Sequence, residues 1–137
     1  MRGVLPDVNL LLASAWETHA GHQKARRWLT AVGPFMTCPI TELGFIRVSM
    51  SPAYAADFED AVGYLALVQK LRSASRIHDD FNPVEIPAVT RYKDTTAAYL
   101  VRLAAAHELR FATLDKAVLK ADWAQGIAYN PLEEVQP

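Results

Sequence analysis

The sequence predicts an α/β fold with a parallel sheet, and two observations carry this prediction. Short apolar segments typical of buried strands, at residues 3–5, 35–38 and 109–114, alternate with longer segments of helical periodicity. This alternation favours parallel strands joined by right-handed helical crossovers. A length of 137 residues, of which 51% are apolar, suits one domain spanning residues 1–137 with a substantial core.

The first half of the chain begins with a strand that runs directly into a helix. Its expected elements are a strand over residues 3–5, helices over 9–16 and 22–32, a strand over 35–38, a helix containing 40–48 and a helix over about 54–72. The second helix carries an apolar stripe and stops at Gly33-Pro34. The third helix follows Pro39, a residue that the first position of a helix tolerates well.

The second half opens with an irregular stretch and ends with the clearest alternation of the chain. Residues 73–87 are rich in Ser, Asp, Asn and Pro, which indicates a loop with one short strand near residues 76–78. The expected elements after it are a helix over 94–107, a strand over 109–114, a short helix over 116–123 and a final strand over 127–129.

Four carboxylates stand at comparable places in this predicted order. Asp7 follows the first strand, Asp115 ends the late strand, Glu42 lies in the first turn of the helix after the second strand, and Asp94 opens the helix before the late strand. Parallel strands place their carboxyl ends at one edge of the sheet, where ligands bind. The alternative is structural, because Asp7 and Asp94 are good N-caps and Glu42 complements a helix dipole.

A cluster of these acids would call for a cation. Two carboxylates 4 Å apart repel by roughly 1 kcal/mol in water and by about 4 kcal/mol at an effective dielectric of 20. Oxygen ligands alone suit Mg²⁺ or Mn²⁺. Zinc is less favoured, because the single Cys38 and four scattered histidines lack a zinc-ligand spacing, although His19 and His22 are close in sequence.

Composition restricts the setting of the protein. The formal net charge of -1 gives no global positive field, so any nucleic acid must bind to a local basic face. Arg47, Arg91, Lys93, Lys116 and Lys120 are the candidates for that face. The lone Cys38 fits a reducing compartment, and the first residues resemble neither a signal peptide nor a membrane span. We therefore expect a cytoplasmic protein with no membrane association.

Four segments in this order resemble the PIN-domain ribonucleases, most closely the VapC-type toxins of bacterial toxin–antitoxin modules. They are LPDVNLLLA (residues 5–13), HQKARRWL (22–29), CPITELGFIRV (38–48) and AAYLVRLAAAHELRFATLDKAVL (97–119). The resemblance implies a three-layer α/β/α sandwich with a central, mainly parallel sheet of four to five strands. It also implies a Mg²⁺- or Mn²⁺-dependent endoribonuclease, usually a homodimer, that a small antitoxin neutralises. DNA would be contacted only through the antitoxin.

The resemblance also assigns site residues. Asp7 matches the first family acid, Glu42 the acid of the Thr-Glu motif and Asp115 the acid that closes the last motif. The position of the remaining family acid is Ala97 in this chain, while Asp94 lies one turn earlier, about 4.5 Å along a helix axis. The predicted catalytic and metal-binding residues are thus Asp7, Glu42, Asp94 and Asp115, with Asp94 as the replacement for the missing acid.

The leading hypothesis is metal-assisted hydrolysis of RNA by the toxin of a toxin–antitoxin pair. Asp7, Asp94 and Asp115 would hold the ion, and Glu42 would complete the cluster and orient or deprotonate the attacking water. We expect the carboxylates of Asp7, Glu42 and Asp115 to converge in one cleft, with no Lys or Arg among the ligands to compensate their charges. Asn9 and Thr113 are candidates to hydrogen-bond them, and polar residues of a turn or strand are the structural alternative.

Two other functions compete with this hypothesis. The first is a binding module that pairs with an antitoxin but has lost efficient catalysis through Ala97. The second is a phospho-acceptor domain like CheY, which expects a paired acidic motif after the first strand and a lysine after the last. Four aromatic residues of the predicted helices, Trp16, Trp28, Phe58 and Tyr64, also suggest more apolar surface than a short chain covers, in keeping with a homodimer.

Overall fold

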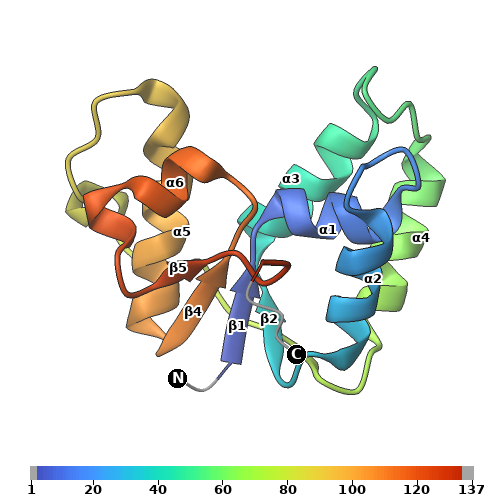
Figure 1. The fold of residues 1–137 in the computed structure, drawn as a ribbon, viewed down its shortest axis with the longest axis horizontal. Coiled ribbons are helices and arrows are strands. Elements are labelled where there is room, and N and C mark those ends of the chain that lie inside the picture. The colour runs from blue at the N-terminus through green and yellow to red at the C-terminus, as the bar shows by residue number, and fades with distance from the viewer. Residues whose placement is uncertain (1–2, 134–137) are drawn as a thin grey trace.

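The computed structural model describes residues 3–133 and is built on a five-stranded sheet whose neighbouring strands pair in parallel. The strand order is β3-β2-β1-β4-β5, so the first strand lies at the centre (Figure 1). The strands are β1 (Gly3–Pro6), β2 (Phe35–Thr37), β3 (Ala74–Arg76), β4 (Leu109–Ala112) and β5 (Ala128–Tyr129). This confirms the predicted α/β fold with a parallel sheet.

Helices cover both faces of the sheet, as the sandwich architecture requires. They are α1 (Val8–Ala15), α2 (His22–Ala31), α3 (Pro39–Ser49), α4 (Phe58–Gln69), α5 (Thr95–Ala106) and α6 (Lys116–Lys120), with 3-10 turns η1 (Pro83–Glu85), η2 (Tyr92–Asp94) and η3 (Asp122–Ala124). Helices α1, α2 and α4 pack on one face and α3 packs against α1 and α4. Helices α5 and α6 lie on the other face (Figure 1).

The alternation of side chains along the central strands divides the core into two halves. In β1, Val4 packs with the α1 and α2 side chains, whereas Leu5 packs with those of α5. In β4, Phe111 joins the α5 side and Ala112 the α1 side. Adjacent strand residues point to opposite faces, so both faces of a sheet covered on two sides must be apolar.

The strand order excludes the phospho-acceptor alternative. CheY-like domains arrange their strands in the order 2-1-3-4-5. Here β1 pairs with β4 in parallel and β3 lies at the edge beyond β2. The hypothesis of a CheY-like domain is therefore wrong for this chain.

Several predicted boundaries differ from the structure, by one to four residues. The helix expected from residue 54 begins at Phe58, because Asp57 caps it through Asp60 N (2.8 Å) and Ala55 has a positive φ of 53° in the turn before it. The strand expected near residues 76–78 is β3, two residues earlier. The helix expected over residues 116–123 divides into α6 and η3.

The surface keeps several large apolar side chains exposed. Of the four aromatic residues considered above, Trp16, Trp28 and Tyr64 pack against the core, whereas Phe58 is 56% exposed. Leu43 and Leu67 are 66% and 64% exposed. Within residues 3–133, no helix is long and apolar enough to cross a membrane.

A close approach at the start of β1 requires glycine. A Cβ on Gly3 would lie 2.6 Å from the backbone oxygen of Pro34, which accepts a hydrogen bond from Val4 N at 3.1 Å. We expect Gly3→Ala to lower the free energy of unfolding by about 1–3 kcal/mol, the usual cost of overpacking. Urea unfolding measures the change. Gly33→Ala is the matched control, since a Cβ there has no atom within 4 Å, and equal effects of the two substitutions would contradict the argument.

Candidate functional site

Pairing of β1 with β4 brings Asp7 and Asp115 to the same edge of the sheet. Pro6 is the register partner of Ala112, and Asp7 N continues the ladder by donating to Ala112 O at 2.8 Å. Asp7 then caps α1 and Asp115 caps α6. Both carboxylates line one cleft of about 590 Å³, so the predicted convergence of these two acids is confirmed.

The buried hydroxyl of Thr113 connects the two acids. Thr113 Oγ1 donates to Asp7 Oδ2 at 2.7 Å and accepts from the backbone N of Asp115 at 3.1 Å. Asn9 Nδ2 also donates to this oxygen at 3.3 Å, and Asn9 Oδ1 accepts from Leu114 N at 3.3 Å. The structure thus confirms that Thr113 bonds an acid directly, while Asn9 supports the pair through Thr113 and the strand end.

The Asp7 carboxyl lies in a setting that disfavours its charge. Burial raises the pKa of Asp7 and is the largest influence on it. Hydrogen bonds from Thr113 and from Val8 N lower that pKa, and the negative charge of Asp115 raises it further. The net effect is an increase, so a cation at this edge would relieve the cost of holding two negative charges close together.

One side of helix α3 forms the opposite wall of the cleft. The lining includes Ile40, Leu43, Gly44, Arg47 and Val48 from α3 and Lys93, Thr96, Ala97 and Leu100 from the region of α5. Gly44 permits the close approach of α3 to α1, because a Cβ there would lie 2.8 Å from a methyl group of Val8. Arg47 and Lys93 place two cationic side chains beside the carboxylates.

Glu42 is not part of this cleft. It is only 7% exposed and forms a two-bond ion pair with Arg76, Nε to Oε2 and Nη2 to Oε1, both at 2.7 Å. Thr37 Oγ1 donates to Oε2 at 2.7 Å, and Thr37 and Arg76 are register partners on β2 and β3. The expectation that these acids lack Lys or Arg partners is therefore wrong for Glu42. The Arg76 hydrogen bonds are the main reason why the pKa of Glu42 is lowered.

Asp94 also has a cationic partner. Its Oδ1 lies 3.4 Å from Arg91 Nη2, and its side chain makes no cap hydrogen bond to α5. The residue of this region that lines the cleft is Ala97, at the position of the missing family acid, with Lys93 and Thr96 beside it.

The donor set at the cleft fits a hard divalent cation. Mg²⁺ is commonly held by one or two carboxylates, with waters and substrate phosphates filling its remaining positions. Asp7 and Asp115 provide such a pair. Among residues 3–133, no group of three or more His, Cys, Asp and Glu side chains is arranged to hold a metal ion. The predicted four-acid cluster is thus reduced in this structure to a pair.

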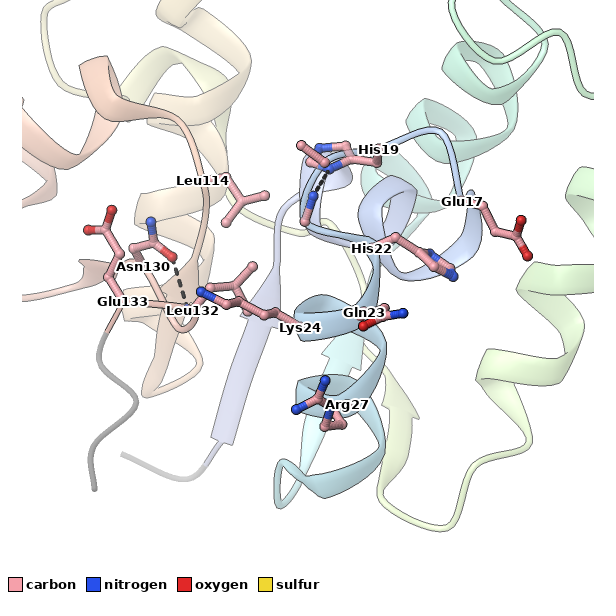
Figure 2. Close-up of a pocket in the computed structure, with 12 residues that line it drawn as sticks. Glu17, His19, His22, Gln23, Lys24, Arg27, Leu114, Asn130, Leu132 and Glu133 are labelled. Carbon is pink, nitrogen blue, oxygen red and sulfur yellow. Dashed lines mark hydrogen bonds between the residues drawn. The ribbon is translucent and has the colours of Figure 1, made fainter.

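A larger pocket of about 980 Å³ lies between the α1–α2 turn and the C-terminal segment (Figure 2). Its charged lining residues are Glu17, Lys24, Arg27 and Glu133, which have both signs. His19 and His22 border it, but each uses its Nδ1 internally, with Gly21 N at 2.9 Å and Ala13 O at 2.8 Å. We find no reason in this arrangement to place chemistry here.

Sequence reasoning missed Arg76 and Gly44, and it did not single out the cationic pair of the cleft wall. Arg47 and Lys93 were candidates for a basic face without a reason to prefer them. The spacing of residues 40, 44, 47 and 48 along one helical face is the signal that relates Gly44 and Arg47 to the same wall. No local pattern relates Arg76 to Glu42, because their contact depends on strand pairing.

Comparison with known proteins gives relatives that span most of the chain. No family model matches it. Ribonuclease VapC38 of Mycobacterium tuberculosis (strain ATCC 25618 / H37Rv) is 36% identical over 121 residues, covering 83% of this chain and 86% of that protein. Ribonuclease VapC44 of the same strain is 33% identical over 129 residues, covering 86% and 89%. Ribonuclease VapC29 of that strain is 34% identical over 117 residues, covering 82% and 85%.

A solved structure shares the fold. The crystal structure of Mycobacterium tuberculosis VapC20, described as a sarcin-ricin loop cleaving toxin, superposes with a TM-score of 0.62. The match covers 98% of this chain and 99% of VapC20 at 16% identity. At that identity the similarity supports the three-layer architecture alone.

The Glu42–Arg76 pair makes a prediction about stability and pH. Because the pKa of Glu42 is lowered in the folded protein, the pair stabilises the fold above the ordinary glutamate pKa of about 4.3 and ceases to do so as the pH falls through the lowered value. We expect Arg76→Ala to lower the melting temperature at neutral pH more than Glu42→Gln, since only the former leaves a buried carboxylate without its cation.

The difference in melting temperature between the parent and Arg76→Ala should shrink as the pH falls through the lowered pKa of Glu42. Melting temperatures measured from neutral to acidic pH by circular dichroism test this, with the exposed Arg72→Ala as the control. A gap that stays constant across the range would show that the pair does not act through the charge of Glu42.

Proposed function

The chain belongs to the VapC family of ribonucleases, and on this premise we propose that it is a divalent-metal-dependent endoribonuclease acting as the toxin of a toxin–antitoxin pair. The observation that carries the proposal is the meeting of Asp7 and Asp115 in one cleft, joined by the buried Thr113 hydroxyl. The relatives are named ribonucleases, which supports the reaction class.

Asp7 and Asp115 are the proposed ligands of Mg²⁺ or Mn²⁺. Asp115 Oδ1 accepts from the backbone N of Ala117 and Val118, which fixes the carboxylate that would hold the ion. Asp7 is oriented in the same way by Val8 N and Thr113. A bound divalent ion would polarise a phosphoryl oxygen and lower the pKa of a coordinated water.

The cationic side chains of the cleft wall would bind the RNA backbone. Arg47 on α3 and Lys93 at η2 are both exposed and line the same cleft as the two acids. A local pair of cations answers the objection raised by the net charge of -1, because phosphate contacts need positive charge only where the backbone lies. Their role is to position the scissile phosphate beside Asp7 and Asp115.

The two remaining candidate acids, Glu42 and Asp94, have different surroundings. Glu42 lies on the face of α3 away from the cleft and is held by Arg76, so we assign it to holding β2, β3 and α3 together in this conformation. Asp94 is paired with Arg91 one turn from the cleft lining. Direct metal binding by either would require exchange of its arginine partner for the ion.

Partners and setting follow from the family and remain proposals. We propose a cognate antitoxin, with DNA contacted only through it, a homodimer and a cytoplasmic location. Exposed apolar side chains on or beside α3 and α4 support protein contacts there, namely Leu43, Met50, Phe58 and Leu67. Light scattering of the chain alone and co-purification with the antitoxin test these assignments. If the antitoxin binds but RNA stays intact, the protein is a binding module without catalysis.

The first test of the proposal removes one carboxylate at a time. We expect Asp7→Asn and Asp115→Asn each to reduce Mg²⁺-dependent RNA cleavage by more than about 100-fold, because loss of a direct ligand exceeds the usual 10- to 100-fold effect of outer partners. Thr113→Val should fall within that lower range, and Thr113→Ser should retain activity. Mn²⁺ binding followed by paramagnetic resonance gives a readout independent of turnover. Cleavage by Asp7→Asn at the parental rate would refute the proposal.

A second test addresses the missing family acid. Ala97 lines the cleft and Asp94 does not, so Ala97→Asp is expected to raise Mn²⁺ affinity, whereas Asp94→Asn is expected to change affinity and melting temperature little. The small stability effect follows because Arg91 is 55% exposed and lies 3.4 Å from Asp94, whose side chain is 16% exposed, and ion pairs near the surface are worth about 0–1 kcal/mol. If Asp94→Asn instead weakens Mn²⁺ binding as much as Asp115→Asn, Asp94 is the replacement ligand.

A further inference from the structure

A second pocket of about 450 Å³ opens beside the cleft. Ile40 and Thr96 line both, so these two residues form the shared wall between them. Phe81, Ile86 and Tyr99 give the pocket its apolar surface, and Asp79 adds a carboxylate. We call it the base pocket.

The base pocket is built largely by the long connection between β3 and α5. Residues 77–94 contain only the 3-10 turns η1 and η2. Connections of this length in compact domains usually carry function. The connection is nevertheless anchored, because Phe81 and Ile86 pack against the core cluster of α5 and β4. The Phe81 ring meets the Tyr99 ring edge-on, with centroids 5.9 Å apart and an interplanar angle of 66°.

We propose that the base pocket binds one nucleobase of the RNA whose phosphate lies in the cleft, and that it prefers guanine. This inference rests on the proposed ribonuclease function. The pocket has the size range of small-molecule sites, an apolar and aromatic lining, and direct continuity with the cleft. Aromatic side chains in such places stack on unpaired bases of single-stranded RNA.

The charged residues of the cleft and of the base pocket favour different parts of a nucleotide. Arg47 and Lys93 line the cleft and not the base pocket, and together with the divalent ion proposed at Asp7 and Asp115 they attract the phosphate to the cleft. Asp79 lines the base pocket and repels a phosphate from it. A nucleotide therefore has one favoured orientation, with its phosphate beside Asp7 and Asp115 and its base beyond Ile40 and Thr96.

Asp79 provides the preference among bases. An ionised carboxylate only accepts hydrogen bonds. Guanine presents two neighbouring N–H donors on its Watson–Crick edge, N1–H and the N2 amino group, whereas the other bases place an acceptor next to their donor. Asp79 lies close enough to Tyr99 for its charge to contribute to the raised pKa of that phenol, although burial is the main cause. Its carboxylate is thus placed beside the aromatic wall.

The test compares Asp79→Asn, Phe81→Leu and the control Val84→Ala. Val84 is 88% exposed in the same connection and does not line the pocket. Phe81→Leu keeps an apolar side chain of similar size, so the core contact of Phe81 is largely retained while the aromatic face is lost. Melting temperatures confirm that each variant is folded. Sequencing of the RNA ends made from a randomised single-stranded pool reports the base beside each cut.

We expect the parent and Val84→Ala to show the same enrichment of guanine at one position beside the cut. Asp79→Asn should lose that enrichment, so that the cuts it still makes show no base preference at that position. Phe81→Leu should raise KM for short RNAs about fivefold or more at nearly unchanged kcat, the lower end of what base stacking on an aromatic ring contributes. If both variants keep the parental preference and KM, the base pocket is not a nucleobase site.

Binding measurements separate this inference from the proposed function. In the Asp7→Asn background, fluorescence anisotropy with a guanine-containing single-stranded RNA and its adenine-substituted counterpart reports affinity without turnover. Tighter binding of the guanine RNA that disappears with Asp79→Asn supports the pocket. If the parent cleaves RNA but the guanine and adenine RNAs bind with equal affinity, the proposal for the base pocket is overturned and the proposed ribonuclease function is not. If the parent neither cleaves nor binds RNA, both proposals are overturned.

Discussion

The candidate site depends on the parallel pairing of β1 with β4. Four register pairs fix this alignment, and the next backbone bond, from Asp7 N to Ala112 O, places the first residue after β1 beside the last residue of β4. Thr113 follows directly and reaches Asp7 Oδ2 with its hydroxyl. A slip of one residue would turn Thr113 to the other face of the sheet, so the carboxylate pair and the hydrophobic core share one constraint.

Much of this arrangement could be predicted from the sequence, because it depends on where strands end. Asp7 and Asp115 each follow an apolar run and precede a helix, and a parallel sheet gathers such positions at one edge. The same logic singled out Thr113 and Asn9. The alternation of short and long apolar segments predicted the class of fold. The predicted boundaries of elements were wrong where a local turn sets the boundary, as at Asp57, which caps the start of α4.

The surroundings of Glu42 and Asp94 could not be predicted, because contacts between distant segments decide them. Both lie at the start of helices, where a carboxylate can turn toward either side. Glu42 turns to Arg76, whose position next to Thr37 depends on the β2–β3 register. Strand β3 has only three residues with little apolar pattern, so its pairing left no clear signal. Recognition of a family acid in a sequence thus locates the residue without fixing its partner.

The distance along the chain between the two halves of the site has a consequence for synthesis. Thr113 and Asp7 are 106 positions apart, and β1 remains without its β4 neighbour until the last third of the chain is available. Ribosomes release the N-terminal part first. A nascent chain therefore carries Asp7 without Asp115 until residues 8–115 have also been made, so the carboxylate pair can assemble only after that stretch has been synthesised.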